Sequence, residues 1–199
     1  MIIATAYNID YKKMADNMIQ SSPYRVISTV VSEDVINNDK DLIIRAEYKP
    51  NAVRKAMLEG EDVAWIDADC LINGLDNPLS DCDVAVTLRR KTVKDQYHYF
   101  SGLLNSGVIF FKNNENGKRF IDIWEESFSK ARSGGDQEAL NIATCITDET
   151  KYGDILIRDG IKIKVLSCDD YNFFYFPEEN SAKVRHYKGD VRQHYPLTK

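Results

Sequence analysis

The sequence lacks an excess of positive charge. Its 26 Lys and Arg residues are outnumbered by 31 Asp and Glu residues, which gives a formal net charge of -5. Nucleic acid backbones are bound by clustered basic residues, so this balance argues against a nucleic acid partner. A small anionic ligand is still compatible with it, because a metal ion and a few local Lys or Arg side chains can offset the repulsion.

Long apolar runs are also absent from the sequence. A membrane-spanning helix needs roughly 18 or more consecutive apolar residues, so we expect no transmembrane segment. Residues 1–8 have neither the basic region nor the long apolar segment of a secretory signal, and we therefore expect no signal peptide.

Cysteine is scarce, and its four residues form no C-x-x-C pair. They are Cys70, Cys82, Cys145 and Cys168, and most of them lie in or beside apolar segments. This spacing is typical of buried free thiols in a reducing compartment, which predicts a cytoplasmic protein. A thiol can serve as a soft metal ligand, but alternation along a strand predicts that Cys70 faces away from the aspartates that precede it.

The composition is that of an ordinary globular protein, with 199 residues of which 43% are hydrophobic and 29% charged. This length suits one domain with a core of its own, and we expect a single domain over residues 1–199. No repeat or low-complexity tract interrupts the sequence.

Apolar and β-branched runs alternate with segments of helical periodicity. We expect strands at 2–6, 24–31, 42–44, 63–66, 83–88, 105–111 and 161–166. We expect helices at 11–19, 49–58, 117–128 and 137–145, with Pro50 in the first turn of the second and Gly60 at its end. This order predicts an α/β fold with a mixed, mainly parallel sheet flanked by helices. The alternation in 161–166 predicts an antiparallel or edge strand.

Two carboxylates follow the buried strand 63–66, because Asp67 and Asp69 are spaced i, i+2. On an extended backbone such side chains point the same way, so the pair can converge on one cation. Parallel sheets bind ligands beyond the carboxyl ends of their strands, and this pair falls there. The alternative is a strand that runs out into a solvated acidic turn.

Polar motifs later in the chain are further candidates for a site. Asn105-Ser106-Gly107 at a strand entry offers hydrogen bonds and close approach to a sugar, or else forms a structural bulge. Asp136-Gln137 begins a helix, where Asp136 is also explained as a cap. His186-Tyr187-Lys188-Gly189 offers a nitrogen ligand and a glycine that lets the backbone approach a phosphate, or else is a surface segment.

A basic cluster precedes the acidic strand and consists of Lys49, Arg54 and Lys55. It is either a solvated helix face or the source of a side chain that reaches a diphosphate.

Taken in order, these segments resemble the GT-A fold of nucleotide-diphospho-sugar transferases, a Rossmann-like fold, and within it glycosyltransferase family 8. The resemblance covers nearly the whole chain. The segments that carry it are Thr5-Ala6-Tyr7-Asn8 with Tyr11, Trp65-Ile66-Asp67-Ala68-Asp69 as a D-x-D motif, Asn105-Ser106-Gly107-Val108, Asp136-Gln137-Glu138-Ala139-Leu140-Asn141, and His186-Tyr187-Lys188-Gly189 as an H-x-x-G motif.

The resemblance implies a metal-dependent glycosyltransferase that moves a sugar from a nucleotide diphosphate sugar to a saccharide, lipid or protein acceptor. UDP is the family's usual nucleotide, and family 8 retains the anomeric configuration. The implied metal is Mn²⁺, or Mg²⁺, which would bridge the donor diphosphate and be held by Asp67, Asp69 and His186.

The remaining implied residues surround that metal. Those lining the nucleoside pocket would be Thr5, Ala6, Tyr7, Asn8 and Tyr11. Those contacting the nucleotide or its diphosphate would be Arg54, Ala68, Gly189 and Arg192, with Asp67 as well. Those facing the donor sugar or the acceptor would be Asn105, Asp136 and Gln137.

The end of the chain departs from the family pattern. Arg192 stands at the place of a lysine, and Gln193 and His194 stand where proline and tryptophan are expected. A lid formed by the C-terminal segment would therefore differ from the family's or be shorter.

Three other functions fit parts of the sequence. A haloacid-dehalogenase-like phosphatase also has a strand that ends in D-x-D, with Asp169 and Asp170 as its late acidic pair, but its motif normally lies on the first strand. A nucleotidyltransferase would need a glycine-rich basic loop after the first strand, where residues 8–11 are not of that type. The third alternative is a catalytically inactive sugar-nucleotide-binding protein.

Overall fold

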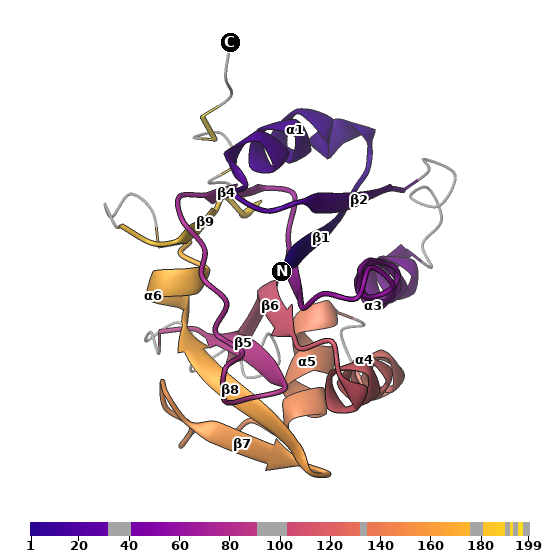
Figure 1. Cartoon of the computed structure of the whole chain (residues 1–199), viewed down its shortest axis with the longest axis vertical. Coiled ribbons are helices and arrows are strands. Elements are labelled where there is room, and N and C mark those ends of the chain that lie inside the picture. The colour runs from indigo at the N-terminus through magenta and orange to yellow at the C-terminus, as the bar shows by residue number, and fades with distance from the viewer. Residues whose placement is uncertain are drawn as a thin grey trace.

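The computed structural model describes residues 1–31, 41–90, 103–131, 135–175, 181–189, 192 and 195–196. Within them a seven-stranded sheet has the order β2-β1-β3-β6-β5-β8-β7 (Figure 1). The strands in this spatial order are β2 Val26–Val30, β1 Ile2–Tyr7, β3 Val63–Ile66, β6 Leu104–Phe111, β5 Val84–Leu88, β8 Ile161–Ser167 and β7 Ile155–Arg158. All but β6 and β7 run in the same direction. The predicted mixed, mainly parallel sheet is thus confirmed.

Three helices cover one face of the sheet: α3 Asp41–Met57, α4 Glu115–Phe128 and α5 Asp136–Thr144 (Figure 1). The apolar stripe of α4 packs here, with Phe120, Ile121 and Trp124 fully buried as the periodicity predicts. Burial of each such side chain contributes roughly 1.5–3 kcal/mol to stability.

The other face carries α1 Lys12–Ser21 and a two-stranded sheet of β4 Cys70–Ile72 and β9 Val184–His186. A short helix α6 Cys168–Tyr171 follows β8, and the 3-10 turn η1 Ile9–Tyr11 precedes α1. Asp83, just before β5, ties three elements together: its carboxylate accepts hydrogen bonds from the Lys162 backbone N at 2.9 Å and from the amides of Asn114 and Asn116 at 2.8 and 3.0 Å.

Because β6 runs antiparallel to β3, the start of β6 lies beside the end of β3. In the β3–β6 register, Ile66 pairs with Val108, so residues 105–107 lie next to the residues that follow β3. The Asp67 backbone N donates to the Gly107 carbonyl at 2.9 Å, which extends this contact beyond the strand. The acidic pair and the Asn105-Ser106-Gly107 motif therefore meet at one edge of the sheet.

Two predicted elements are wrong. Residues 42–44 lie in α3 and not in a strand, and this helix begins at Asp41, so Pro50 stands in its interior and not in its first turn. A three-residue apolar run does not distinguish a strand from a buried helical turn, and a proline inside a helix is rare enough to suggest a boundary. The strands β4, β7 and β9 and helix α6 were not predicted.

The strand 161–166 is only partly as expected. It pairs in antiparallel register with β7, but in parallel register with β5, so β8 does not lie at the edge. In the part of the chain that the structure describes, helices are too short or too polar to cross a membrane. Gln193, His194 and His98 lie outside the described residues.

Candidate functional site

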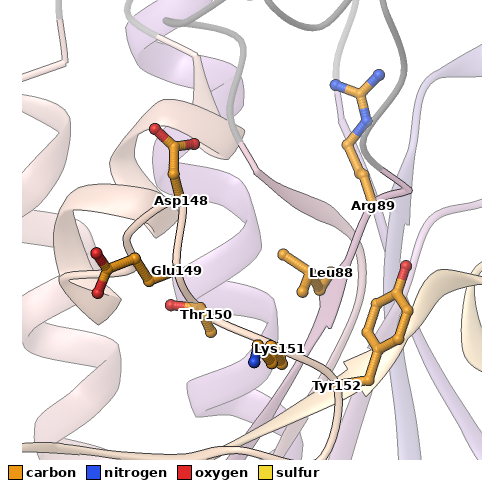
Figure 2. Close-up of a pocket in the computed structure, with 7 residues that line it drawn as sticks. All are labelled: Leu88, Arg89, Asp148, Glu149, Thr150, Lys151 and Tyr152. Atoms are coloured by element: carbon orange, nitrogen blue, oxygen red, sulfur yellow. The ribbon is translucent and has the colours of Figure 1, made fainter.

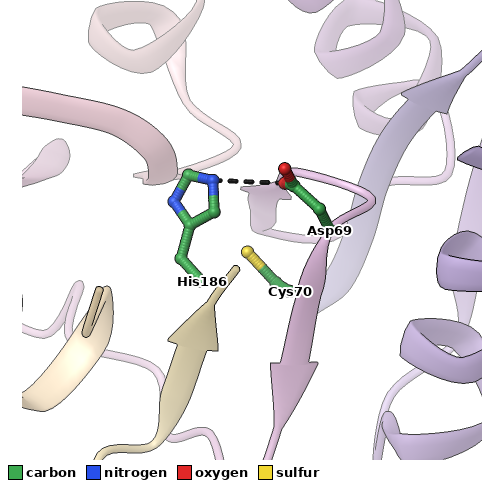
Figure 3. Close-up of side chains that lie close together, drawn as sticks. All are labelled: Asp69, Cys70 and His186. Carbon is green, nitrogen blue, oxygen red and sulfur yellow. Dashed lines mark ion pairs between the residues drawn. The ribbon is translucent and has the colours of Figure 1, made fainter. Parts of the chain in front are cut away.

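The acidic pair lies in a tight turn between β3 and β4. The Cys70 backbone N donates to the Asp67 carbonyl at 3.1 Å, which closes the turn over residues 67–70. The expected extended backbone is therefore wrong here. The turn also changes which way Cys70 faces: its Sγ lies near the ligand atoms of Asp69 and His186, all within 4.8 Å of one another (Figure 3). The prediction that Cys70 points away is thus wrong as well.

Proximity does not make Cys70 a ready ligand. Burial raises the pKa of its thiol well above the ordinary value of 9.0, and the charges of Asp69 and Asp67 raise it further. Burial and the two aspartates therefore favour the neutral thiol, whereas metals bind the thiolate. Of the other cysteines, Cys82 and Cys168 are buried and Cys145 is exposed, contrary to the expectation for the last.

Strand pairing brings His186 to the acidic turn. In the antiparallel β4–β9 register, His186 pairs with Cys70, and the Tyr187 backbone N donates to the Asp69 carbonyl at 2.9 Å. The His186 Nε2 lies 3.1 Å from Asp69 Oδ1 and 3.7 Å from Asp67 Oδ2. Both carboxylates thus lie beside the same imidazole nitrogen, so the structure brings the three predicted residues together.

Gly107 leaves the space that the His186 ring occupies. A Cβ atom at position 107 would lie 2.4 Å from both Cε1 and Nδ1 of His186, closer than side-chain atoms can approach. The sequence suggested that this glycine allows close contact with a sugar. Its observed role is to admit the histidine.

Two basic residues compensate the carboxylates. Arg192 Nε donates to Asp69 Oδ2 at 2.8 Å, and Lys49 Nζ lies 2.9 Å from Asp67 Oδ1. Burial by itself would raise the pKa of Asp69, but the adjoining His186 and Arg192 outweigh it and hold that pKa well below the ordinary range. In the same way burial would lower the pKa of Lys49, yet Asp136 and Asp67 raise it.

Lys49 joins the acidic turn to the start of α5. Besides Asp67 it forms an ion pair with Asp136, whose Oδ2 also accepts from the Ser106 hydroxyl at 2.7 Å. Burial would raise the pKa of Asp136, and Lys49 lowers it overall. Asp136 is the first residue of α5, and Gly135 is the N-cap, so the expected capping role is wrong. Gln137 follows, and its Oε1 accepts from Lys188 Nζ at 3.3 Å.

Asn105 lies beside these groups with one amide hydrogen-bond donor unused. Its Oδ1 accepts from the Gly107 backbone N at 2.9 Å, while its buried Nδ2 has no partner among the described residues. A buried donor without a partner is costly unless a ligand satisfies it.

The predicted nucleoside residues lie in the carboxyl-terminal half of β1 and just after it, on the same edge of the sheet. Thr5 is fully buried, and its hydroxyl also lacks a partner in the described part of the chain. Ala6 and Tyr7 complete the strand, and Asn8 Oδ1 accepts from the Tyr11 backbone N at 3.3 Å. The Arg192 guanidinium stacks on the Tyr11 ring, 5.0 Å from its centroid. This contact links the nucleoside segment to Asp69.

Arg54, Ala68 and Gly189 were predicted to contact the nucleotide or its diphosphate, and the structure shows where each of them lies. Arg54 pairs with Asp122 at 2.7 Å and with Glu125, both on α4, and it is Lys49 of the same basic cluster that reaches the carboxylates. Ala68 is 5% exposed within the turn. Gly189 is exposed with a φ of 60°, a left-handed conformation that favours glycine.

A separate hollow of about 710 Å³ lies at the carboxyl end of β5 (Figure 2). It is lined by Leu88, Arg89, Asp148, Glu149, Thr150, Lys151 and Tyr152. Phe174 connects it with the site, since the Arg89 guanidinium lies 5.4 Å and Lys188 Nζ 5.2 Å from the centroid of that ring.

The sequence matches the nucleotide-diphospho-sugar transferase family over residues 32–195. The chain belongs to this family. It is therefore an enzyme of the glycosyltransferase class, with a nucleotide sugar as the donor of its family. No curated protein is significantly similar to it in sequence.

Solved glycosyltransferases share the fold of this nucleotide-diphospho-sugar transferase. A glycosyltransferase involved in glycosylation of the major capsid of PBCV-1 superposes with a TM-score of 0.64 at 14% identity, covering 98% of both chains. The galactosyltransferase LgtC with donor and acceptor sugar analogs gives 0.53 at 14% identity, covering 96% of this chain and 88% of LgtC. GlyE of Streptococcus pneumoniae TIGR4 gives 0.51 at 14% identity, over 100% of this chain and 61% of GlyE. The predicted GT-A fold is confirmed, while membership of family 8 stays a prediction.

Proposed function

We propose that this transferase is metal-dependent and uses a UDP-sugar with Mn²⁺ or Mg²⁺, with retention at the anomeric carbon. One observation supports the proposal above the others. His186 is far from Asp67 and Asp69 in sequence, yet its Nε2 lies 3.7 Å from an Asp67 oxygen and 3.1 Å from an Asp69 oxygen at the edge of the sheet.

The donor set fits such an ion. Mn²⁺ accepts mixed oxygen and nitrogen ligands. His186 Nδ1 is already engaged with the side-chain oxygen Oδ1 of Asn172 at 2.9 Å, so Nε2 is the atom that faces the carboxylates. When bound, the ion would neutralise negative charge that develops on the departing nucleoside diphosphate.

The surrounding side chains have chemistry suited to the donor. Lys49 pairs with Asp67 and Arg192 pairs with Asp69. Both cations would also attract the negatively charged diphosphate. Tyr11, stacked on Arg192, would border the nucleoside. The unused Asn105 amide donor would bind a hydroxyl of the donor sugar, with Asp136 and Gln137 at the sugar or acceptor side. No covalent nucleophile is assigned.

The phosphatase alternative is less well supported. Asp169, one of its late acidic pair, forms an ion pair with Arg90 at 2.7 Å, while the groups that join Asp67 and Asp69 are His186, Lys49 and Arg192. Metal-dependent hydrolysis of a generic phosphate monoester, lost in Asp67→Asn, would revive that alternative.

Thermal unfolding with Mn²⁺, UDP and both together tests the proposal. A ligand at 100 times its Kd stabilises the native state by about 2.7 kcal/mol. If the ion contacts the diphosphate as proposed, each ligand strengthens binding of the other, so the two together should raise Tm by more than the sum of their separate effects. Asp67→Asn and Asp69→Asn should abolish the joint shift. Asp76→Asn is the matched control, because Asp76 forms an exposed pair with Lys183.

Two results would contradict this assignment: a joint shift that persists in both aspartate variants, or none in the native protein with any nucleoside diphosphate. A joint shift without slow donor hydrolysis, across a panel of nucleotide sugars, would instead identify an inactive sugar-nucleotide-binding protein. NMR of the anomeric proton of the released sugar decides retention.

A further inference from the structure

Asn172 lies behind the His186 ring, on the side away from the aspartates. It ends α6 and is fully buried. Its position is set by backbone pairing with β9, because the His186 backbone N donates to the Phe173 carbonyl at 2.8 Å and the Phe173 backbone N donates to the Val184 carbonyl at 2.9 Å. The Asn172 Oδ1 and His186 Nδ1 are 2.9 Å apart.

The orientation of the Asn172 amide is fixed by β5 and β6. Its Nδ2 donates to Thr87 Oγ1 at 2.9 Å and to the Asn105 carbonyl at 3.4 Å. The Thr87 hydroxyl in turn donates to that same Asn105 carbonyl at 2.9 Å. A flipped amide would direct its oxygen at the carbonyl oxygen, so the NH₂ group must face Thr87 and the oxygen must face His186.

This orientation determines where the imidazole carries its hydrogen. An amide oxygen only accepts, so its contact with His186 Nδ1 requires an N–H there. Asp69 Oδ1, 3.1 Å from Nε2, accepts any hydrogen on that nitrogen, and a cation bound at Nε2 would replace this hydrogen and leave the Nδ1–H form. Gly107 packs against the ring edge and leaves the imidazole little freedom to rotate.

We propose that Asn172, held by Thr87, is a positioning residue that fixes His186 as the Nδ1–H tautomer and presents Nε2 to a divalent cation. The cation rests on the function proposed above, but the tautomer does not. Groups of this kind behind a ligating histidine typically change metal affinity by about 10–100-fold when they are removed.

Binding of Mn²⁺ alone, followed by electron paramagnetic resonance of the free ion, tests the first part. Asn172→Leu removes the acceptor and should weaken binding about tenfold or more. Asn172→Asp keeps an acceptor for Nδ1–H, and the Thr87 hydroxyl can turn from the Asn105 carbonyl to donate to the second carboxylate oxygen, so this variant should bind within about threefold of the native protein. Should Asn172→Leu not fold, Thr87→Val removes the hydroxyl that orients the amide and should weaken binding, while Thr87→Ser keeps it and should not. Thermal unfolding in parallel separates a purely structural role, which would lower Tm and leave the Mn²⁺ affinity of the folded protein unchanged.

Histidine ¹⁵N spectra of the metal-free protein test the second part. The chain has three histidines, so the His186 signals are assigned by their loss in His186→Gln. At alkaline pH the native protein and Asn172→Asp should show the Nδ1–H form. In Asn172→Leu the hydrogen should move to Nε2, where carboxylates accept it.

An Nε2–H form in the native protein, or unchanged tautomer and Mn²⁺ affinity in both Asn172→Leu and Thr87→Val, would overturn the proposal. Absence of Mn²⁺ binding by the native protein would contradict the proposed function instead, and the spectra would still decide the tautomer.

Discussion

At the scale of single residues, the site depends on which side chains can come close to His186. Gly107 is the clearest case, since its missing Cβ is the space for the ring. Lys49 also shapes the site, because its largely buried ammonium group pairs with both Asp67 and Asp136, which come from different elements. Both residues act by position, and neither role follows from residue type alone.

Gly107→Ala should therefore displace His186. The added methyl group would overlap the ring, so we expect Mn²⁺ affinity to fall about tenfold or more and Tm to drop. Titration of Mn²⁺ with nucleoside diphosphate measures the first effect. Gly74→Ala is the matched control, since a Cβ there meets nothing within 4 Å. Equal affinity in the two variants would show that the ring tolerates the methyl group.

Lys49→Met and Arg54→Met should differ strongly although both residues belong to α3. Lys49→Met leaves two aspartates without their shared cation, which we expect to cost about 3 kcal/mol of unfolding free energy and the UDP-dependent stabilisation. Arg54 pairs with Asp122 and Glu125 at a partly exposed site, so its loss should cost about 1 kcal/mol and leave UDP binding intact. Urea unfolding with and without UDP measures both. Loss of UDP binding in Arg54→Met would contradict this prediction and show that Arg54 contributes to diphosphate binding.

At the scale of elements, the long apolar strands could be predicted from sequence, but the short ones that build the site could not. Residues 63–66 and 108–111 are continuous apolar runs, and the strands predicted at 63–66 and 105–111 were found with nearly correct bounds. β4 and β9 have three residues each, too few to show a period, yet their pairing brings His186 to Asp69.

The candidate residues were found through the order of their motifs, which is independent of local periodicity. Asp67, Asp69 and His186 were named together for this reason, while the turn that unites them was not foreseen. Asn172 was missed because it belongs to no motif and lies in an aromatic segment.

Asp83 should make the junction of β5, β8 and α4 sensitive to acid. Burial would raise the pKa of Asp83, but the donors at Lys162, Asn114 and Asn116 lower it below the ordinary 3.8. Its contribution to stability is therefore fully present above that value and is lost as pH falls through the lowered pKa. Asp83→Asn should cost about 1–2 kcal/mol at neutral pH, and the difference from the native protein should shrink below about pH 4. Urea unfolding from pH 7 to pH 3 checks this, and a difference independent of pH would contradict it.

At the scale of the whole molecule, the C-terminal residues return to the first helix. The Tyr195 hydroxyl donates to the carbonyls of Met14 and Cys70 at 3.0 and 3.1 Å, and Asn17 Nδ2 donates to the Pro196 carbonyl at 3.0 Å. Tyr187 packs edge-on against Tyr195, with centroids 5.0 Å apart. Arg192 lies between Tyr187 and Tyr195 in sequence, so packing contacts hold the chain on both sides of the residue that binds Asp69.

Tyr195→Phe should loosen this segment while keeping the ring contact. Loss of the hydroxyl should cost about 1 kcal/mol of unfolding free energy and weaken UDP binding several-fold, because Arg192 is held less firmly. Thermal unfolding and UDP titration measure the two effects. Tyr152→Phe, at a half-exposed tyrosine that lines the β5 hollow, is the control. Unchanged UDP affinity in Tyr195→Phe would show that Arg192 is positioned without this anchor.

The distance in sequence between Asp69 and Arg192 also has a consequence for synthesis of the chain. The two residues are 123 positions apart, so at roughly 5–20 residues per second a ribosome releases Asp69 about 6–25 s before its partner exists. During that time both aspartates lack Arg192 and His186, and β4 lacks the strand that pairs with it. A nascent chain can therefore form most of the large sheet first, and under the proposed function it becomes able to bind the donor only after His186 and Arg192 have been translated.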